Sequence, residues 1–135
     1  MPEHLSEALR TNLSGSKTVE QMLGAAAQRI AFMSQEEILR RIQTGAPDIT
    51  LLDVRERESY EQGHIPGAIL IPRGQLELRV DALLPDPTAR IVVYCQYGKV
   101  STLATATLRE MGFTRAIAMA QGMESWLEKG YPTST

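Results

Sequence analysis

The chain of 135 residues is long enough for one domain with at most a short appendage. Apolar residues make up 43% and charged residues 22% of it, near the averages of packed globular chains, which excludes collagen-like and wholly disordered classes. The formal net charge of −2 argues against a nucleic-acid-binding module, because neutralising phosphates requires clustered positive charge.

The first part of the chain predicts a mobile tail over residues 1–16 and then a helix. Thr18 and Gln21 fit a capping box at the start of that helix. Apolar residues then recur at the spacing of one helix face: Val19, Met22, Leu23, Ala26, Ala27 and Ile30. A short apolar step over residues 30–33 indicates a first edge strand.

A second capping box, Ser34 with Glu37, opens the next predicted helix. Gly45 fits the position just past its end, and Pro47 prevents it from continuing. Residues 49–54 are mostly apolar without alternation, which is typical of a parallel strand buried on both faces.

The middle of the chain predicts a short charged helix over residues 55–62 that ends at Gly63. Residues 64–67 form a turn, because Pro66 fixes its φ angle and Gly67 permits unusual backbone angles. We expect a short strand over residues 68–71 and a helix over residues 76–84.

Residues 91–94 are the clearest strand, since they are rich in β-branched side chains. A helix is predicted over residues 101–111, with four inward side chains: Leu103, Thr107, Leu108 and Met111. A short strand at residues 116–119 follows, and Gly122 introduces a final helix that contains Met123, Trp126 and Leu127.

Strands alternate with helices from residue 30 onward, which predicts an α/β sandwich with a parallel sheet and right-handed crossovers. We divide the chain into an N-terminal tail and amphipathic helix, residues 1–29, and a domain over residues 30–135.

Cys95 follows the strand at residues 91–94 and precedes a helix, and ligands of open α/β sheets bind at this edge. Free backbone N–H groups and the helix dipole at that position both favour a thiolate. Gly98 allows the loop to curl around the sulfur as an anion-binding nest, and Ser101 can offer a hydroxyl. A lone cysteine is more often a buried apolar residue, but this context favours a reactive thiol.

The other loop residues have different expected places. We expect Lys99 to place one mobile positive charge near the opening of the site around Cys95, and Gln96 and Tyr97 to line its rim.

Four separated segments resemble the single-domain rhodaneses, a family of sulfurtransferases, and they lie within residues 30–132. They are Leu52-Asp53-Val54-Arg55 with Glu56, Tyr60 and Gly63; Gly63-His64-Ile65-Pro66-Gly67-Ala68; the loop from Cys95 to Val100; and Gly122-Met123-Glu124-Ser125-Trp126 with Gly130-Tyr131-Pro132. Each segment alone is weak evidence for the resemblance, but all four in this order are specific to the family.

The resemblance implies a three-layer α/β/α fold with a mainly parallel five-stranded sheet, to which this chain adds its N-terminal helix. It also implies a persulfide on Cys95, loaded from a donor such as thiosulfate and passed to cyanide or a thiol. The active loop would comprise Gln96, Tyr97, Gly98, Lys99, Val100 and Ser101. No second cysteine can resolve the persulfide, so the acceptor must come from outside the chain.

The chain departs from this family at two positions. Many relatives carry Arg at the last loop position, where this chain has Val100, which weakens the expected binding of a dianionic donor. Lys99 and Arg55 compensate in part, and Arg73 is a weaker candidate. Gln121 stands where a glycine often precedes the last motif, which we expect to change a local turn only.

Several nearby residues have a structural reading beside the functional one. Asp53 either orients the active loop or caps the following helix, and we favour structural support. Arg55 binds the anionic donor or pairs with Asp53 or Glu56, and we favour the ion pair. His64 is expected to hydrogen-bond within its turn, and Trp126 to pack in the core.

Two other functions compete with sulfur transfer. Phosphatases of related fold use a longer loop that ends in Arg, usually with His before the cysteine, whereas here Tyr94 precedes Cys95 and no Arg closes the loop. A sulfur-carrier or docking protein would relay persulfide between partner proteins with little thiosulfate turnover, and Val100 and the extra helix both leave room for it.

The expected surroundings of the protein follow from the same composition. No apolar run approaches the ~20 residues that cross a bilayer, and the N-terminus lacks the features of a signal peptide, so we expect a cytoplasmic protein. One cysteine and two histidines leave few metal ligands, so no metal or cofactor is expected. Expected partners are a small sulfur donor, a thiol or cyanide acceptor, an accepting protein, and a second copy through the N-terminal helix.

Overall fold

The computed structural model describes residues 15–45 and 48–135. The five strands form one sheet in the order β1-β5-β4-β2-β3, and each neighbouring pair is parallel. The strands are β1 (Phe32–Met33), β2 (Thr50–Asp53), β3 (Ile69–Leu70), β4 (Ile91–Tyr94) and β5 (Ile117–Met119). The helices are α2 (Val19–Arg29), α3 (Gln35–Gln43), α4 (Arg57–Gln62), the 3-10 turn η1 (Arg73–Gln75), α5 (Leu76–Leu83), α6 (Lys99–Glu110) and α7 (Met123–Glu128). The predicted parallel α/β fold is confirmed, while the predicted tail through residue 14 and the role of Pro47 lie outside the described residues.

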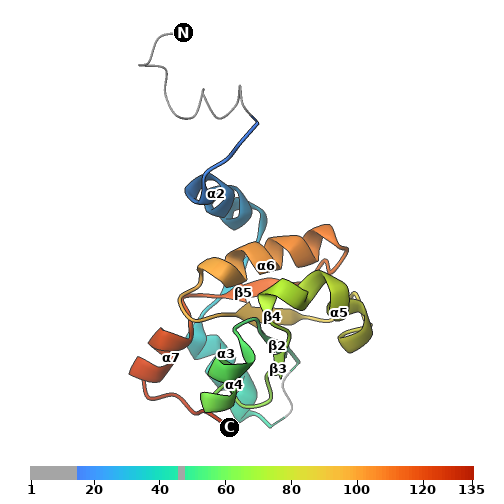
Figure 1. Ribbon diagram of the computed structural model, residues 1–135. Helices are drawn as coiled ribbons and strands as arrows, with labels where there is room; N and C mark the ends of the chain where they lie inside the picture. The colour runs from blue at the N-terminus through green and yellow to red at the C-terminus, as the bar shows by residue number, and fades with distance from the viewer. Residues whose placement is uncertain (1–14, 46–47) are drawn as a thin grey trace.

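Helices cover both faces of the sheet, which makes three layers (Figure 1). Along β4 the side chains alternate, so that Val93 faces α5 and α6 whereas Val92 and Tyr94 face α3 and α7. Each face therefore has its own buried apolar cluster. Continuing the alternation past β4 puts Cys95 on the α6 side.

Helix α2 lies on the outer side of α6 and adds a further layer (Figure 1). Its predicted capping box forms completely, with Thr18 and Gln21 each accepting from the other's backbone N–H. The apolar face predicted for this helix is only partly covered within the described chain. Only Ala26 is buried, whereas Val19 is 65% and Met22 48% exposed, because α6 covers a single narrow stripe of α2.

Helix α3 begins as predicted, but only half of its capping box forms. The Ser34 hydroxyl accepts from the Glu37 N–H at 3.1 Å. The Glu37 carboxylate instead binds Arg40 and Arg41, because two cations on its own helix outcompete one backbone amide. Gly45 follows the helix with a φ of 80°, which fits its predicted place past the end.

Helix α6 begins at Lys99, two residues earlier than the sequence pattern indicates. Leu108 is buried and Leu103 and Thr107 are half-buried, but the prediction that Met111 points inward is wrong. Met111 lies just beyond the last helical residue, where the chain turns toward Gly112, and it is 37% exposed.

Within residues 15–45 and 48–135, no helix is both long and apolar enough to span a membrane.

Candidate active site

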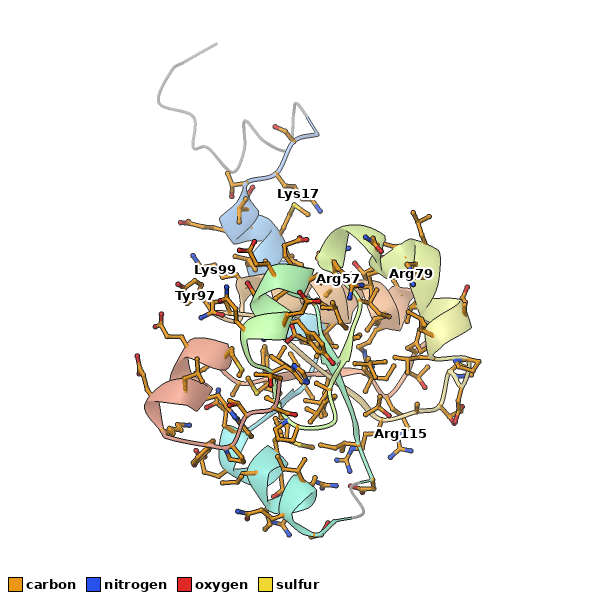
Figure 2. The ribbon with its side chains drawn as sticks, turned by 60° about the horizontal axis from the view of Figure 1, so that its bottom comes forward. Lys17, Arg57, Arg79, Tyr97, Lys99 and Arg115 are labelled. Atoms are coloured by element: carbon orange, nitrogen blue, oxygen red, sulfur yellow. The ribbon has the colours of Figure 1, made fainter. Side chains whose placement is uncertain are left out.

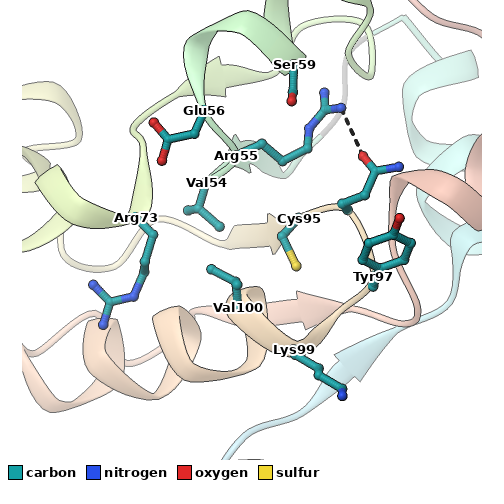
Figure 3. A pocket seen from close by; sticks show the side chains of 10 residues that line it. Val54, Arg55, Glu56, Ser59, Arg73, Cys95, Tyr97, Lys99 and Val100 are labelled. Carbon is teal, nitrogen blue, oxygen red and sulfur yellow. Dashed lines mark hydrogen bonds between the residues drawn. The ribbon is translucent and has the colours of Figure 1, made fainter.

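Cys95 lies directly after β4, at the edge of the sheet where β2 also ends. Its side chain is only 4% exposed and reaches a pocket of about 560 Å³ (Figure 3). The pocket is lined by Val54, Arg55, Glu56, Ser59, Arg73, Cys95, Gln96, Tyr97, Lys99 and Val100. The structure thus brings most of the predicted site residues around one thiol.

The sulfur atom of Cys95 makes three hydrogen bonds with groups of the loop. The backbone N–H groups of Gly98 and Ser101 donate to Sγ at 3.1 and 3.2 Å. The Ser101 hydroxyl lies 3.3 Å from Sγ and accepts from the thiol. Two amide dipoles that converge on one sulfur stabilise negative charge there, which is what a nucleophilic thiolate requires.

Helix α6 adds to this effect because its first turn is part of the loop. Gly98 is its N-cap residue, with a φ of 103° that favours glycine. A Cβ at Gly98 would lie 2.9 Å from the Gln121 carbonyl oxygen, so the loop also has no room for a side chain there. The early start of α6 places Lys99, Val100 and Ser101 in the first turn, where backbone N–H groups have no partner within the helix.

The carbonyl groups of the loop point toward α7. The N–H of Met123 donates to the Cys95 carbonyl at 2.9 Å, and the N–H of Glu124 donates to the Gln96 carbonyl at 3.1 Å. Because the C=O and N–H of a trans peptide point in opposite directions, the amides of Gln96 and Tyr97 face away from α7.

Four amides of the loop remain available to a ligand. The N–H groups of Gln96, Tyr97, Lys99 and Val100 have no acceptor in the part of the chain that the structure describes. Together with the two that hold Sγ, they are the set of donors that an anion-binding nest requires.

Asp53 and Arg55 form a buried ion pair beside the loop. The guanidinium donates to both carboxylate oxygens, with Nη2 2.8 Å from Oδ2, and the Arg55 N–H donates to Oδ1 at 2.9 Å. Burial opposes the charge of Arg55, but the hydrogen bonds and charge of Asp53 outweigh it and raise the pKa of Arg55. The favoured ion pair is present. The helix-cap interpretation of Asp53 is wrong, because Glu56 is the N-cap residue of α4.

Arg55 also ties this pair to the loop. Its Nη2 donates to the Gly63 carbonyl at 2.8 Å, and its Nη1 lies 3.4 Å from the Gln96 side-chain oxygen (Figure 3). With its charge matched by Asp53 and its donors engaged, Arg55 acts as a brace between β2 and the active loop.

Tyr94 lies beneath this brace, on the opposite face of β4 from Cys95. Its hydroxyl accepts from the Ile65 N–H at 3.1 Å, and the Arg55 guanidinium lies 5.8 Å from the ring centre. Burial, with the nearby Asp53 carboxylate, raises the pKa of the Tyr94 hydroxyl far above its ordinary value. Tyr94 therefore stays neutral.

The rim of the pocket is mixed in character. Lys99 and Tyr97 extend from the loop into solvent (Figure 2), and Val100 is 43% exposed. Arg73 reaches the pocket as expected. Its guanidinium also donates to Glu77 at 2.9 Å and to the Thr107 hydroxyl at 3.3 Å, and the Glu77 carboxylate offsets its charge.

Sequence reasoning missed three lining residues, Val54, Glu56 and Ser59. Val54 and Glu56 stand within and beside the motif at residues 52–55, so that motif could have indicated them.

His64 and Trp126 lie outside the pocket, as expected. The His64 Nδ1 is 2.9 Å from the Tyr60 carbonyl, and the Trp126 indole is buried and donates to the Pro132 carbonyl at 2.8 Å. Across the described ranges, no group of three or more His, Cys, Asp or Glu side chains could hold a metal ion.

The sequence of the chain is similar to a known protein family. The sequence model of the Rhodanese-like domain matches residues 34–129. The "Putative sulfur carrier protein YrkF" of Bacillus subtilis is 34% identical over 103 residues, which cover 76% of this chain and 54% of that protein. This chain therefore spans about half the length of that relative.

Two further similar proteins have names that refer to different activities. The human "Thiosulfate:glutathione sulfurtransferase" is 37% identical over 94 residues, which cover 58% of this chain and 79% of that one. The solved structure of RPA3614 from Rhodopseudomonas palustris, described as a "Possible Tyrosine Phosphatase", covers 99% of both chains with a TM-score of 0.78 and 26% identity.

Proposed function

The chain belongs to the rhodanese-like family, a family of sulfurtransferases and sulfur carriers, and we propose that it transfers sulfane sulfur through a persulfide on Cys95. One observation carries this proposal. Two amides converge on Sγ, and four further amides of the same loop are free to hold a second, anionic sulfur. A persulfide is an anion one sulfur longer than the thiolate, and this nest provides donors for both atoms.

In the first half-reaction the Cys95 thiolate attacks the sulfane sulfur of a donor such as thiosulfate. A bond forms between Sγ and that sulfur, and the bond from the sulfane sulfur to the sulfonate sulfur breaks. Sulfite leaves with the electron pair, and the persulfide anion remains on Cys95. The loop amides and the α6 dipole stabilise the negative charge that moves onto the outer sulfur.

In the second half-reaction a nucleophile removes the outer sulfur. Cyanide leaves as thiocyanate, or a thiolate leaves as a persulfide, and Sγ regains the electron pair of the broken bond. Cys95 is the single cysteine of the chain, so the accepting nucleophile comes from outside it. The human relative's name points to a thiol acceptor of low molecular mass.

Intact-protein mass spectrometry tests the proposal most directly. After incubation with thiosulfate, the wild-type chain should gain the mass of one sulfur atom and lose it on addition of cyanide. Cys95→Ala should gain nothing while keeping its fold, because the side chain is small and buried among apolar neighbours. Sulfur loading of Cys95→Ala at the wild-type level would contradict the mechanism.

A sulfur carrier is the second candidate, and Val100 favours it. An apolar residue at the end of the loop leaves that position without a cation to attract a dianion, while a partner protein could still deliver sulfur to Cys95. The name of the Bacillus subtilis relative points the same way. A carrier should load fully from a protein persulfide and slowly from thiosulfate, so the ratio of the two loading rates separates the candidates.

Phosphatase activity is disfavoured by the residues around the thiol. Only five residues separate Cys95 from Ser101, whose amide already closes on Sγ, and Val100 offers no guanidinium to a phosphoryl group. Tyr94, which stays neutral, precedes the cysteine. Turnover of p-nitrophenyl phosphate that depends on Cys95 would reverse this ranking.

A further inference from the structure

The turn between β5 and α7 forms the outer wall of the active loop. A Cβ at Gly122 would lie 2.3 Å from the Gln96 carbonyl oxygen, and one at Gly98 would lie 2.9 Å from the Gln121 oxygen. The two backbones therefore touch without any intervening side chain. A displacement of this turn moves the loop with it, because the N–H groups of Met123 and Glu124 hold the loop carbonyls.

The turn adopts a backbone that needs support from elsewhere. Gln121 has a φ of 62°, which is the one positive value at a non-glycine residue in the described ranges. Residues other than glycine rarely adopt a positive φ, because their Cβ then crowds the following carbonyl. Such a conformation persists where the surrounding contacts over-determine it.

Gln35, at the start of α3, makes those contacts. It is 1% exposed, and its amide nitrogen donates to the Ala120 carbonyl at 3.1 Å and to the Gly122 carbonyl at 3.0 Å. The two acceptors flank the strained residue, so one side chain fixes both ends of the turn.

The orientation of this amide is defined by its partners. Both partners are carbonyls, so the NH₂ group must face them, and Oε1 is left buried without a partner in the described residues. A glutamate at this position would have no donor when ionised, and a shorter amide would not reach. The position therefore requires the two donors of a glutamine.

We propose that Gln35 is a positioning residue for the thiol, which acts through the β5–α7 turn on the amides that hold Cys95 Sγ. The inference rests on the proposed function, because a positioned thiol matters only if Cys95 reacts. The geometry that Gln35 maintains can be tested without sulfur transfer. Gln35 does not touch the pocket, and its contribution is to keep the loop carbonyls turned toward α7 and the amides turned toward the sulfur.

The chain has one cysteine, so the rate of alkylation by iodoacetamide measures the reactivity of Cys95 alone. Gln35→Met keeps the volume and removes both donors. It should lower the alkylation rate at neutral pH by about tenfold and move the pH profile of the rate upward, because fewer aligned amides stabilise the thiolate. The charged groups that line the pocket, Arg55, Glu56, Arg73 and Lys99, are unchanged in this variant, so the shift reports on the backbone.

Ile38→Val is the matched control. It trims another fully buried side chain of α3, one that packs in the apolar core and has no donor for the turn carbonyls, and should leave the alkylation profile unchanged. If Gln35→Met does not fold, Gln35→Asn keeps an amide that is too short to reach both carbonyls and carries the same expectation.

A wild-type alkylation profile for a folded Gln35 variant overturns the inference, and so does an equal shift in Ile38→Val. Sulfur transfer is not part of this readout. A wild-type chain that alkylates normally but never loads sulfur would defeat the proposed function and leave the role of Gln35 standing.

Discussion

Val100 is the residue that we propose limits the choice of sulfur donor most directly. It lies in the first turn of α6 and lines the pocket, so a side chain there faces the incoming donor. Three cations line the pocket. Arg55 forms an ion pair with Asp53 and Arg73 forms one with Glu77, which leaves Lys99 to attract an anionic donor. A dianion such as thiosulfate thus meets amide dipoles and little net positive charge.

Val100→Arg should therefore raise kcat/KM for thiosulfate by about tenfold, since a full charge near the bound dianion contributes ~1.4 kcal/mol even in a well-screened setting. The measurement is steady-state thiocyanate production at low ionic strength. Val100→Gln, which has similar reach and no charge, is the control and should show no gain. An equal gain in both variants would mean that side-chain size limits donor binding, and that charge does not.

The residues of the site differ in how far sequence alone could place them. Cys95 and its loop are predictable, because a strand of β-branched residues followed by cysteine, glycine and a helix leaves few geometries. Gln35 is not, because its partners lie 85 and 87 residues away in the chain and meet it only after the sheet has formed. Glutamine is also common in exposed helix positions, so its type gave no hint of burial.

At the scale of elements, the helices show where sequence patterns mislead. The caps of α2 and α3 are local features, and Thr18 and Ser34 begin their helices as predicted. Burial is not local. The sequence predicts a continuous apolar face on α2, but α6 buries only Ala26 of that face.

A glycine inside α2 gives a test of whether this helix is part of the cooperative unit. Gly24 is helical, and a Cβ there would contact nothing within 4 Å. Gly24→Ala should stabilise the protein by ~0.5–1 kcal/mol, because alanine has the higher helix propensity and loses less backbone entropy on folding. Thermal unfolding followed by circular dichroism should show a Tm higher by a few degrees.

Gly45→Ala is the control with opposite sign. It also has open space around a Cβ, but its φ of 80° is strained for alanine, so this change should lower the Tm. If Gly45→Ala lowers the Tm while Gly24→Ala leaves it unchanged, α2 unfolds separately from the domain.

At the scale of the whole molecule, the loop and its supports come from widely separated parts of the chain. The loop follows β4, its brace Arg55 follows β2, and its outer wall is the β5–α7 turn held by α3. The parallel sheet makes this convergence, because the strand ends that carry these segments meet at one edge. The placement of α3 is thus a condition for the geometry of the thiol.

Ion pairs connect α3 to its neighbours. The Lys129 ammonium donates to Glu36 at 2.9 Å and holds the pKa of that carboxyl below its ordinary 4.5. Arg41 pairs with Asp48 and lowers the pKa of Asp48 in the same way. Within α3, Arg40 lowers the pKa of Glu37. Glu36, Arg40, Asp48 and Lys129 are exposed, and Glu37 and Arg41 are half-buried, so each pair contributes modestly and is screened by salt.

These shifts predict how stability depends on pH. Each carboxyl has a lower pKa in the folded than in the unfolded chain, so the unfolded chain binds more protons as the pH falls. The stabilisation is therefore complete above about pH 5 and is lost as the pH drops through ~4.5 and below. The Tm, followed by circular dichroism, should be level from pH 6 to pH 5 and decline below that, and 1 M NaCl should flatten the decline. A Tm that stays level down to pH 3 at low salt would show that these pairs do not hold α3 in place.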